Sequence, residues 1–315
     1  MAGTPTTTTT SPPPVPTAPG GRSGSAGKGR TAGSRYPYWF YLPAAVLYTV
    51  LFVLPTFASF FFALTRWRLI DFQFIGFDNF VLFFREPALV TGLVNTIIFG
   101  VVTSAAKVVL GLLLAVLLTS HIIGRGLLRS LVFFPVLVST IGVGITFTVL
   151  MDPFDGLFNQ VLGAVGVDGP GWLTDPSLAL LSVAAVDVWK GVGLATVIYI
   201  AGIVSIPSEY FEAAEVDGAG SWRRFRSITL PLARPATVTV IILSLIGGLR
   251  SFDLIWAMTR GGPGFTSDVI ASVIYKQYQA GFFGLSTAGN VVLFLVVTAI
   301  VLPLFWWLNR KEVEL

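Results

Sequence analysis

The sequence lacks cysteine altogether, contains a single histidine, and is poor in charge, since only 11% of its 315 residues are charged. Without cysteine there is no disulfide and no thiolate metal site, and the lone His121 argues against a histidine metal centre. A soluble domain carries roughly 25% charged residues. Apolar residues make up 54% of this chain, in runs that suit transmembrane helices rather than the alternating strands of an outer-membrane barrel. We therefore predict an all-α integral membrane protein surrounded by lipid bilayer.

Recognisable catalytic motifs are missing as well. The chain has no HExxH and no GxSxG, which argues against a membrane-embedded hydrolase. It also has no GxxxxGK(S/T) loop, so this chain cannot hydrolyse ATP itself. The net charge of +4 does not indicate a nucleic-acid partner, because the basic residues gather on one side of the predicted membrane. We expect no enzyme activity, no metal and no cofactor in this chain.

Six apolar runs reach the ~20 residues needed to cross the hydrocarbon core. They are approximately residues 39–64, 95–119, 131–150, 179–204, 236–258 and 285–308. Residues 1–35 have almost no large apolar side chain and are predicted to be a disordered cytoplasmic tail. The remaining divisions are 36–90 (first span and outer connection), 91–308 (a core of five helices with a polar loop at 205–235) and 309–315 (a second cytoplasmic tail). An amphipathic helix near the surface is expected within residues 267–283.

The distribution of lysine and arginine predicts the orientation of the spans. With the N-terminus inside, inner segments hold twelve basic residues and outer segments five. The inner ones are Arg22, Lys28, Arg30, Arg35, Arg125, Arg129, Arg223, Arg224, Arg226, Arg234, Arg310 and Lys311, and the outer ones are Arg66, Arg68, Arg85, Arg260 and Lys276. This excess predicts a multi-pass protein of the cell (inner or cytoplasmic) membrane, with both termini and the 205–235 loop in the cytoplasm.

The polar loop has the composition of a folded segment rather than of a slack connection. Its first half is rich in good helix formers, with acids near the start. Gly218 and Gly220 allow the chain to leave this helix through a left-handed turn. Ser221 can cap a second short helix that carries three arginines, and Pro231 and Pro235 are expected to close it. We predict a small helix–turn–helix at a membrane face.

A pattern of ten residues in this loop is informative, namely Glu212, Ala213, Ala214, Asp217, Gly218, Ala219, Ile228, Thr229, Leu230 and Pro231. It resembles the EAA loop of binding-protein-dependent ABC importer permeases, in which the loop is a coupling helix that docks into a cleft on the ATPase. Three other segments, residues 76–80, 251–253 and 261–264, also look like carbohydrate-uptake permeases. The chain is most similar to the maltose- and glycerol-phosphate-type first permease subunit, over about residues 36–310.

The resemblance implies a type I ABC importer permease fold with six transmembrane helices. It implies a permease subunit of an ATP-driven importer for a sugar or sugar derivative. The expected partners are a second homologous permease, two ATPase subunits that bind the ATP and Mg, and an extracytoplasmic solute-binding protein. Glu212 is expected to make a polar contact inside the ATPase cleft, and Ala213 and Ala214 to allow close backbone approach. Gly218 fits both a coupling turn and an ordinary helix end.

Ionisable residues inside the predicted spans define a second candidate site. Asp187 and Lys190 are three residues apart and share a face of the fourth span, as Arg250 and Asp253 do on the fifth. Matching depths predict that Lys190 faces Asp253 and that Arg250 faces Asp187. Lys107 lies near the middle of the second span, with no partner assigned. The candidate translocation-path residues are Asp187, Lys190, Gly191, Arg250, Ser251 and Asp253. Such charges usually face a bundle interior or a watery path, and a purely structural role stays open.

An ion-gradient-driven secondary transporter is the alternative function. It would also carry charges inside the membrane, but it needs no docking loop, and the inverted repeats expected of such a protein are not evident. An ATPase subunit that co-purifies, and that hydrolyses ATP only in the complex, would discriminate between the two.

Overall fold

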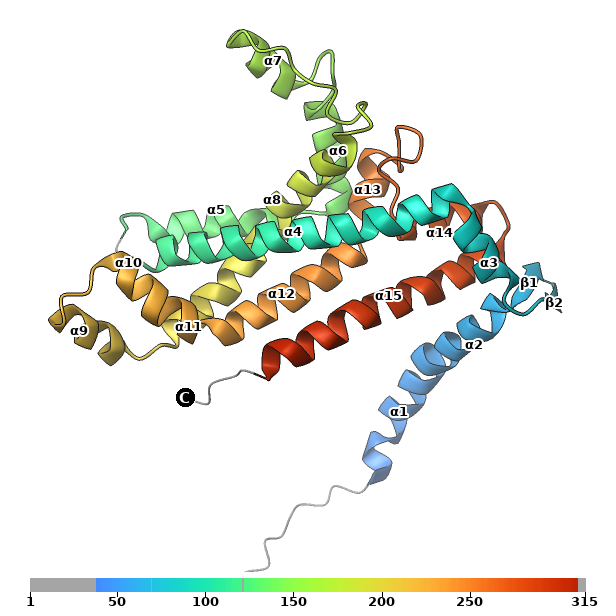
Figure 1. Ribbon diagram of the computed structural model, residues 1–315, viewed down its shortest axis with the longest axis horizontal. Coiled ribbons are helices and arrows are strands. Elements are labelled where there is room, and N and C mark those ends of the chain that lie inside the picture. The colour runs from blue at the N-terminus through green and yellow to red at the C-terminus, as the bar shows by residue number, and fades with distance from the viewer. Residues whose placement is uncertain (1–37, 69, 121, 311–315) are drawn as a thin grey trace, which may run out of the picture. The chain divides into compact units, whose positions relative to one another are not determined.

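The computed structural model describes residues 38–68, 70–120 and 122–310, and the chain divides into two compact units, residues 1–49 and 50–315. The predicted tail at 1–35 and most of that at 309–315 lie outside the described residues. In the first unit, a 3₁₀ helix (Tyr38–Tyr41) leads into α1 (Leu42–Tyr48). The second unit is mainly helical (Figure 1). This confirms the predicted all-α class, with one small hairpin as an addition.

The second unit contains two strands and a series of α-helices. In chain order they are α2 (Leu54–Ala63), β1 (Thr65–Arg68), β2 (Asp71–Phe74), α3 (Asp78–Arg85), α4 (Pro87–Thr119), α5 (Arg125–Leu137), α6 (Thr140–Leu150), α7 (Leu157–Ala164), α8 (Ala179–Val204), α9 (Ser208–Val216), α10 (Ser221–Arg224), α11 (Leu230–Leu232), α12 (Arg234–Leu249), α13 (Asp253–Met258), α14 (Ile270–Gln279) and α15 (Phe283–Asn309). Two π-helical segments occur at Thr49–Val53 and Phe225–Thr229.

α4 is the helix on which the bundle is assembled, because it packs against α8, α12 and α14 (Figure 1). Glycines permit this close approach. A Cβ at Gly111 would lie 2.8 Å from the Cβ of Ala195 on α8, and one at Gly100 would lie 2.8 Å from Cδ2 of Leu249 on α12. Neither position has room for a methyl group, so both helix contacts require glycine, which has no side chain.

Among the described residues, four helices are long and apolar enough to cross a membrane, or up to six if each of two bent helix pairs is one span. The four are Trp39–Ala63, Pro87–Thr119, Ala179–Val204 and Phe283–Asn309. The predicted fourth span has the same bounds as α8. The six predicted spans thus correspond to the upper end of this range.

Two of the predicted spans are not single straight helices. α5 and α6 meet at an angle of 99°, and α6 begins after Ser139, whose hydroxyl accepts the N–H of Gly142. α12 ends at Leu249, and helix resumes only at Asp253 in α13. The predictions of continuous helices over 131–150 and 236–258 are therefore wrong, because hydropathy does not register a local break within an apolar run.

The connection between α6 and α8 is organised by two carboxylates. Asp152 accepts the N–H groups of Asp155 and Phe154. Asp175 accepts the hydroxyl and the N–H of Ser177. Because these hydrogen bonds favour the charged forms, those from Asp155 and then Phe154 lower the pKa of Asp152, and those from the Ser177 hydroxyl and then its N–H lower the pKa of Asp175. Both groups lie in loops, outside the spans.

Candidate functional site: a helical loop and a buried charge pair

The helix α9 ends in the glycine turn that the sequence predicts. Gly218 has a φ of 71°, and its N–H donates to the carbonyl of Glu215 at 3.0 Å, while the N–H of Ala219 donates to that of Ala214 at 2.8 Å. This pair of bonds is the Schellman motif, which satisfies carbonyls at a helix end. The left-handed exit at Gly218 is confirmed, whereas Gly220 is extended, with φ −66° and ψ 166°.

The helical part after the turn begins one residue earlier than predicted. Ser221 is the first residue of α10 and not its cap, since the N-cap position belongs to Gly220 and no side chain caps the helix. Helical backbone continues through the segment Phe225–Thr229 into α11 and ends at Leu232. Pro231 lies in the first turn of α11, within this continuous helical segment. The helical part thus ends between Pro231 and Pro235, where the sequence predicts its end.

The loop presents apolar side chains that nothing within the described chain covers. The exposed fractions are 90% for Val216, 72% for Trp222 and 47% for Tyr210. Of the predicted coupling residues, Glu212, Ala213, Asp217, Gly218, Leu230 and Pro231 are exposed, and Ala214, Ala219 and Ile228 are half-buried. Large apolar side chains that stand open beside carboxylates favour a surface that docks onto a partner.

One ion pair links the two helical parts of the loop. Arg224 Nη1 lies 3.5 Å from Glu215 Oε2, and the glutamate side chain is 77% exposed. Exposed pairs contribute only about 0.2–1 kcal/mol. The direction of α9 therefore depends on the Gly218 turn more than on this pair.

A second ion pair lies inside the helical bundle. Lys107 Nζ on α4 is 2.5 Å from Asp187 Oδ2 on α8, and the two side chains are 9% and 21% exposed. The sequence placed both residues inside spans but assigned Lys107 no partner. A lysine in the middle of an apolar helix needs a nearby carboxylate, and this requirement is the signal that could have identified the pair.

Gly191 makes room for the lysine side chain. A Cβ at this position would lie 2.7 Å from Cε and 3.0 Å from Nζ of Lys107. Lys107 and Gly191 also line a cavity of about 170 Å³ between α4, α8 and α12, together with Ser244 and Gly247 of α12. The predicted path residue Gly191 thus lies directly beside the charge pair.

The predicted pairing of charges between the fourth and fifth spans is wrong. In the part of the chain that the structure describes, Asp187 pairs with Lys107, and no ion pair within 4.0 Å joins Lys190 to Asp253 or Arg250 to Asp187. Arg250 and Asp253 also do not share a helical face, because the chain leaves α12 at Arg250 and Asp253 opens α13. Ser251 is half-buried in this break.

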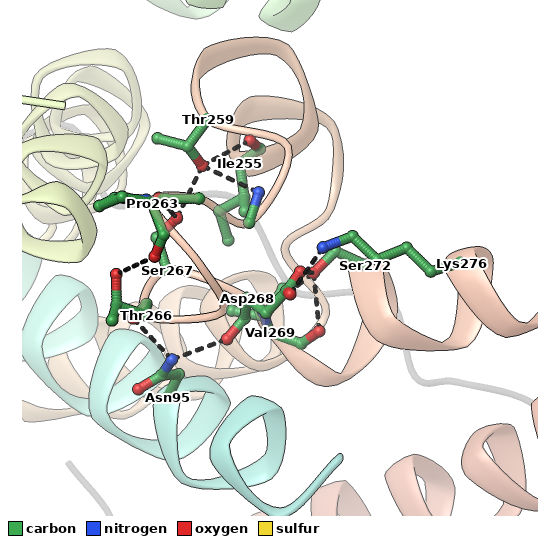
Figure 2. A network of polar contacts seen from close by, with 12 residues as sticks. Asn95, Ile255, Thr259, Pro263, Thr266, Ser267, Asp268, Val269, Ser272 and Lys276 are labelled. Atoms are coloured by element: carbon green, nitrogen blue, oxygen red, sulfur yellow. Dashed lines mark hydrogen bonds and ion pairs between the residues drawn. The ribbon is translucent and has the colours of Figure 1, made fainter. Parts of the chain in front are cut away.

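A polar network fixes the loop between α13 and α14 (Figure 2). Asp268 is fully buried and accepts hydrogen bonds from Lys276 Nζ and Ser272 Oγ, both at 2.7 Å. Asn95 on α4 donates to the carbonyl oxygens of Thr266 and Asp268 at 2.9 and 2.8 Å. A Cβ at Gly261 would lie 1.8 Å from Asp268 Oδ1. The buried carboxylate and its partners therefore hold the loop against α4.

The described residues contain no group of three or more histidine, cysteine, aspartate or glutamate side chains placed to hold a metal ion. The expectation that this chain itself binds no metal and no cofactor stays a prediction.

Long apolar helices around a buried charge pair, with an exposed polar loop at one end, indicate an integral membrane protein. Residues 107–312 match the family described as the binding-protein-dependent transport system inner membrane component, and the chain belongs to this family.

Several relatives are named as sugar permeases. The chain is 33% identical to the trehalose/maltose transport system permease protein MalF of Thermococcus litoralis, over 82% of this chain and 89% of that protein. It is 30% identical to the lactose transport system permease protein LacF of Rhizobium radiobacter, over 86% and 94%. Among solved structures it is similar to a bacterial ABC transporter involved in the import of the acidic polysaccharide alginate, with a TM-score of 0.79 and 25% identity over 88% of this chain and 96% of that one.

Proposed function

We propose that this chain is the transmembrane permease subunit of an ATP-driven, binding-protein-dependent importer for a sugar or sugar derivative. The observation that carries the proposal is the uncovered α9–α10 loop, in which a glycine turn presents acidic and apolar side chains together. The names of the relatives support the substrate class. An ion-gradient-driven transporter is not favoured, because it gives no reason for a rigid docking loop.

The subunit works with partners that supply what it lacks. A second homologous permease completes the translocation path, and an extracytoplasmic solute-binding protein delivers the substrate. Two ATPase subunits bind ATP and Mg, and this chain contributes no catalytic group to hydrolysis. The chain resides in the cell (inner or cytoplasmic) membrane with both termini in the cytoplasm, so the ATPases reach the loop from that side.

The loop couples ATP hydrolysis to movement of the helices. Glu212 makes the polar contact in the ATPase cleft, and Ala213 and Ala214 permit close backbone approach. The apolar side chains Val216 and Trp222 add buried area once docked. Closure of the ATPase dimer then draws α9 sideways, and because α9 is joined to α8 by residues 205–207 and to α12 through the helical segment 221–232, these helices tilt as rigid bodies.

The path itself runs past the charged residues of α8 and of the break after α12. We place Asp187, Lys190, Gly191, Arg250, Ser251 and Asp253 along it. Asp187 has one carboxylate oxygen that does not contact Lys107 and 21% of its side chain exposed, which suits hydrogen bonding to sugar hydroxyls. Lys107 holds that carboxylate in place through its other oxygen.

A crosslinking experiment tests the docking assignment. The chain contains no cysteine, so Val216→Cys introduces a single thiol on the loop, and Phe154→Cys, 87% exposed between α6 and α7, is the matched control. A short bifunctional reagent is expected to join the Val216→Cys variant to the ATPase subunit, while the Phe154→Cys variant gives no such product. If the two variants give equal yields, or if uptake proceeds on an ion gradient without the ATPase, the proposal is wrong.

A further inference from the structure

A cavity of about 680 Å³ lies away from the loop and from the charge pair, at the opposite end of α4. It is lined by residues of β1, of α3, of the turn that joins α14 to α15 and of the start of α15, and Figure 1 shows where these elements lie. The side chains that decide its chemistry are Arg66, Trp67, Arg68, Asp78 and Asn79. The translocation mechanism uses none of them.

The cavity has an excess of positive charge. Arg66 and Arg68 are alternate residues of β1, so their side chains leave the same face of the strand. Both are exposed, and within the described ranges no carboxylate lies within 4.0 Å of either. Asp71 faces Arg68 across the hairpin without forming an ion pair, and Asp78 is the one acidic lining residue.

Backbone donors add to this potential. The helix α15 is 27 residues long, and no side chain caps its first turn at Phe282. Phe282, Gly284 and Leu285 all line the cavity. Free N–H groups and the positive end of the helix dipole attract anions, and here they reinforce a cavity that the two arginines already make cationic. Asn79 adds no donor, because its amide bonds to the carbonyls of Ala63 and Thr65.

An aromatic cluster adjoins the cavity at Trp67, which is one of its lining residues. Trp67 stacks on Phe62 with ring centroids 4.2 Å apart and lies 5.7 Å from Phe283, which is itself 5.3 Å from Tyr278. Clusters of tryptophan and tyrosine mark the headgroup level of a bilayer. At the headgroup level of the bilayer, the anion expected in a pocket is the phosphate of a lipid. The planar guanidinium group of arginine fits the oxygens of a phosphate.

We propose that this cavity binds the phosphate of a phospholipid headgroup, with Arg66 and Arg68 as the ligating side chains and the first turn of α15 as a backbone contribution. The bound lipid would fill the corner between the hairpin and α15 and so brace the hairpin against the bundle.

Lipid titration of the full-length chain in detergent, followed by native mass spectrometry, tests the proposal. The probes are a phosphatidylglycerol and a diacylglycerol with the same acyl chains, so that only the phosphoglycerol headgroup differs. Wild type is expected to retain phosphatidylglycerol and not diacylglycerol. In Arg66→Gln/Arg68→Gln the affinity is expected to fall roughly tenfold to a hundredfold, because charge-assisted hydrogen bonds are lost. Arg85→Gln removes one exposed arginine of α3 outside the cavity lining; it is the control for loss of surface charge and should bind as wild type does.

Four results would overturn the proposal. One is equal retention of phosphatidylglycerol by wild type and by Arg66→Gln/Arg68→Gln. Another is an equal loss in Arg85→Gln, which would indicate general surface charge. The third is displacement of the lipid by millimolar inorganic phosphate, which would make the site one for free phosphate. The fourth is unchanged lipid binding by Arg66→Gln/Arg68→Gln together with weaker binding of the solute-binding protein, which would make the cavity a contact site for that protein instead of a lipid site. Arg66→Lys/Arg68→Lys, which keeps the charge, should retain part of the affinity, and equal melting temperatures show that all variants fold.

Discussion

Two of the ion pairs among the described residues have opposite physical settings. Arg224 and Glu215 lie 3.5 Å apart on the exposed loop, whereas Lys107 and Asp187 lie 2.5 Å apart inside the bundle. Water screens the first pair, so it contributes little to stability. In the second pair, each charge compensates the other for the water that it has lost on burial. Removing either partner therefore leaves a buried charge without water and without a counter-charge. We infer that the loop is built for contact with a partner and that the buried pair is a condition for the folded bundle.

The largest effect is expected from breaking the buried pair. Lys107→Met leaves Asp187 without its cation and should destabilise the protein by about 3–5 kcal/mol, measured by thermal unfolding in detergent. Lys107→Met/Asp187→Leu removes both charges and should restore most of the loss. Lys190→Met is the matched control and should have a much smaller effect. A double variant that is as unstable as Lys107→Met would show that the charges are not coupled.

A second prediction concerns Gly191, which lies beside the buried ion pair. Gly191→Ala places a methyl group 2.7 Å from Lys107 Cε, and overpacking of this kind costs about 1–3 kcal/mol. Gly247→Ala lines the same cavity but meets no atom within 4 Å, so its melting temperature should match or exceed that of wild type. Equal destabilisation by both substitutions would contradict the placement of the lysine side chain.

The exposed pair should respond weakly. Arg224→Gln or Glu215→Gln is expected to change the free energy of unfolding by less than about 1 kcal/mol, and high salt should remove even this difference. The measurement is the same thermal unfolding in detergent at low and high salt. A loss as large as that of Lys107→Met would place the loop in the folding core instead of on a docking surface.

The smallest effect is expected at acidic pH, where the connection between α6 and α8 should open locally. The pKa values of Asp152 and Asp175 are lowered in the folded state, so their contribution is present above the unfolded pKa and is lost as the pH falls through the folded one. Local opening of residues 152–177, followed by hydrogen exchange, should therefore increase below about pH 4. Asp175→Asn should weaken this dependence, and an unchanged pH profile would exclude Asp175 as its source.

The sequence predicted elements that depend on local signals. The bounds of α8 follow from a single apolar run, and the turn at Gly218 follows from a glycine at the end of a helix-forming stretch. The exposure of Glu212 follows from its place in a polar loop between two long apolar runs. None of these features depends on which distant residues pack against them, so each can be predicted from the sequence alone.

Other features depend on contacts between distant residues. Asp187 is 80 residues from Lys107, and depth along a span does not reveal which helix lies next to it, so Lys190 and Arg250 were paired with the wrong partners. The bend at Ser139 interrupts a run whose hydropathy is continuous. The helix breaks and the buried ion pair could therefore not be predicted without knowing how the helices pack around α4.

The central claim is that the loop transmits ATP hydrolysis and contributes little to the fold, and Glu212→Lys tests it most directly. The variant would be assembled with its ATPase subunits and solute-binding protein in proteoliposomes, and sugar uptake would be measured beside the melting temperature of the purified chain. The account predicts an unchanged melting temperature with uptake reduced at least roughly tenfold, because a reversed charge at a buried contact costs several kcal/mol. Wild-type uptake at normal membrane level, or a large fall in melting temperature, would contradict it.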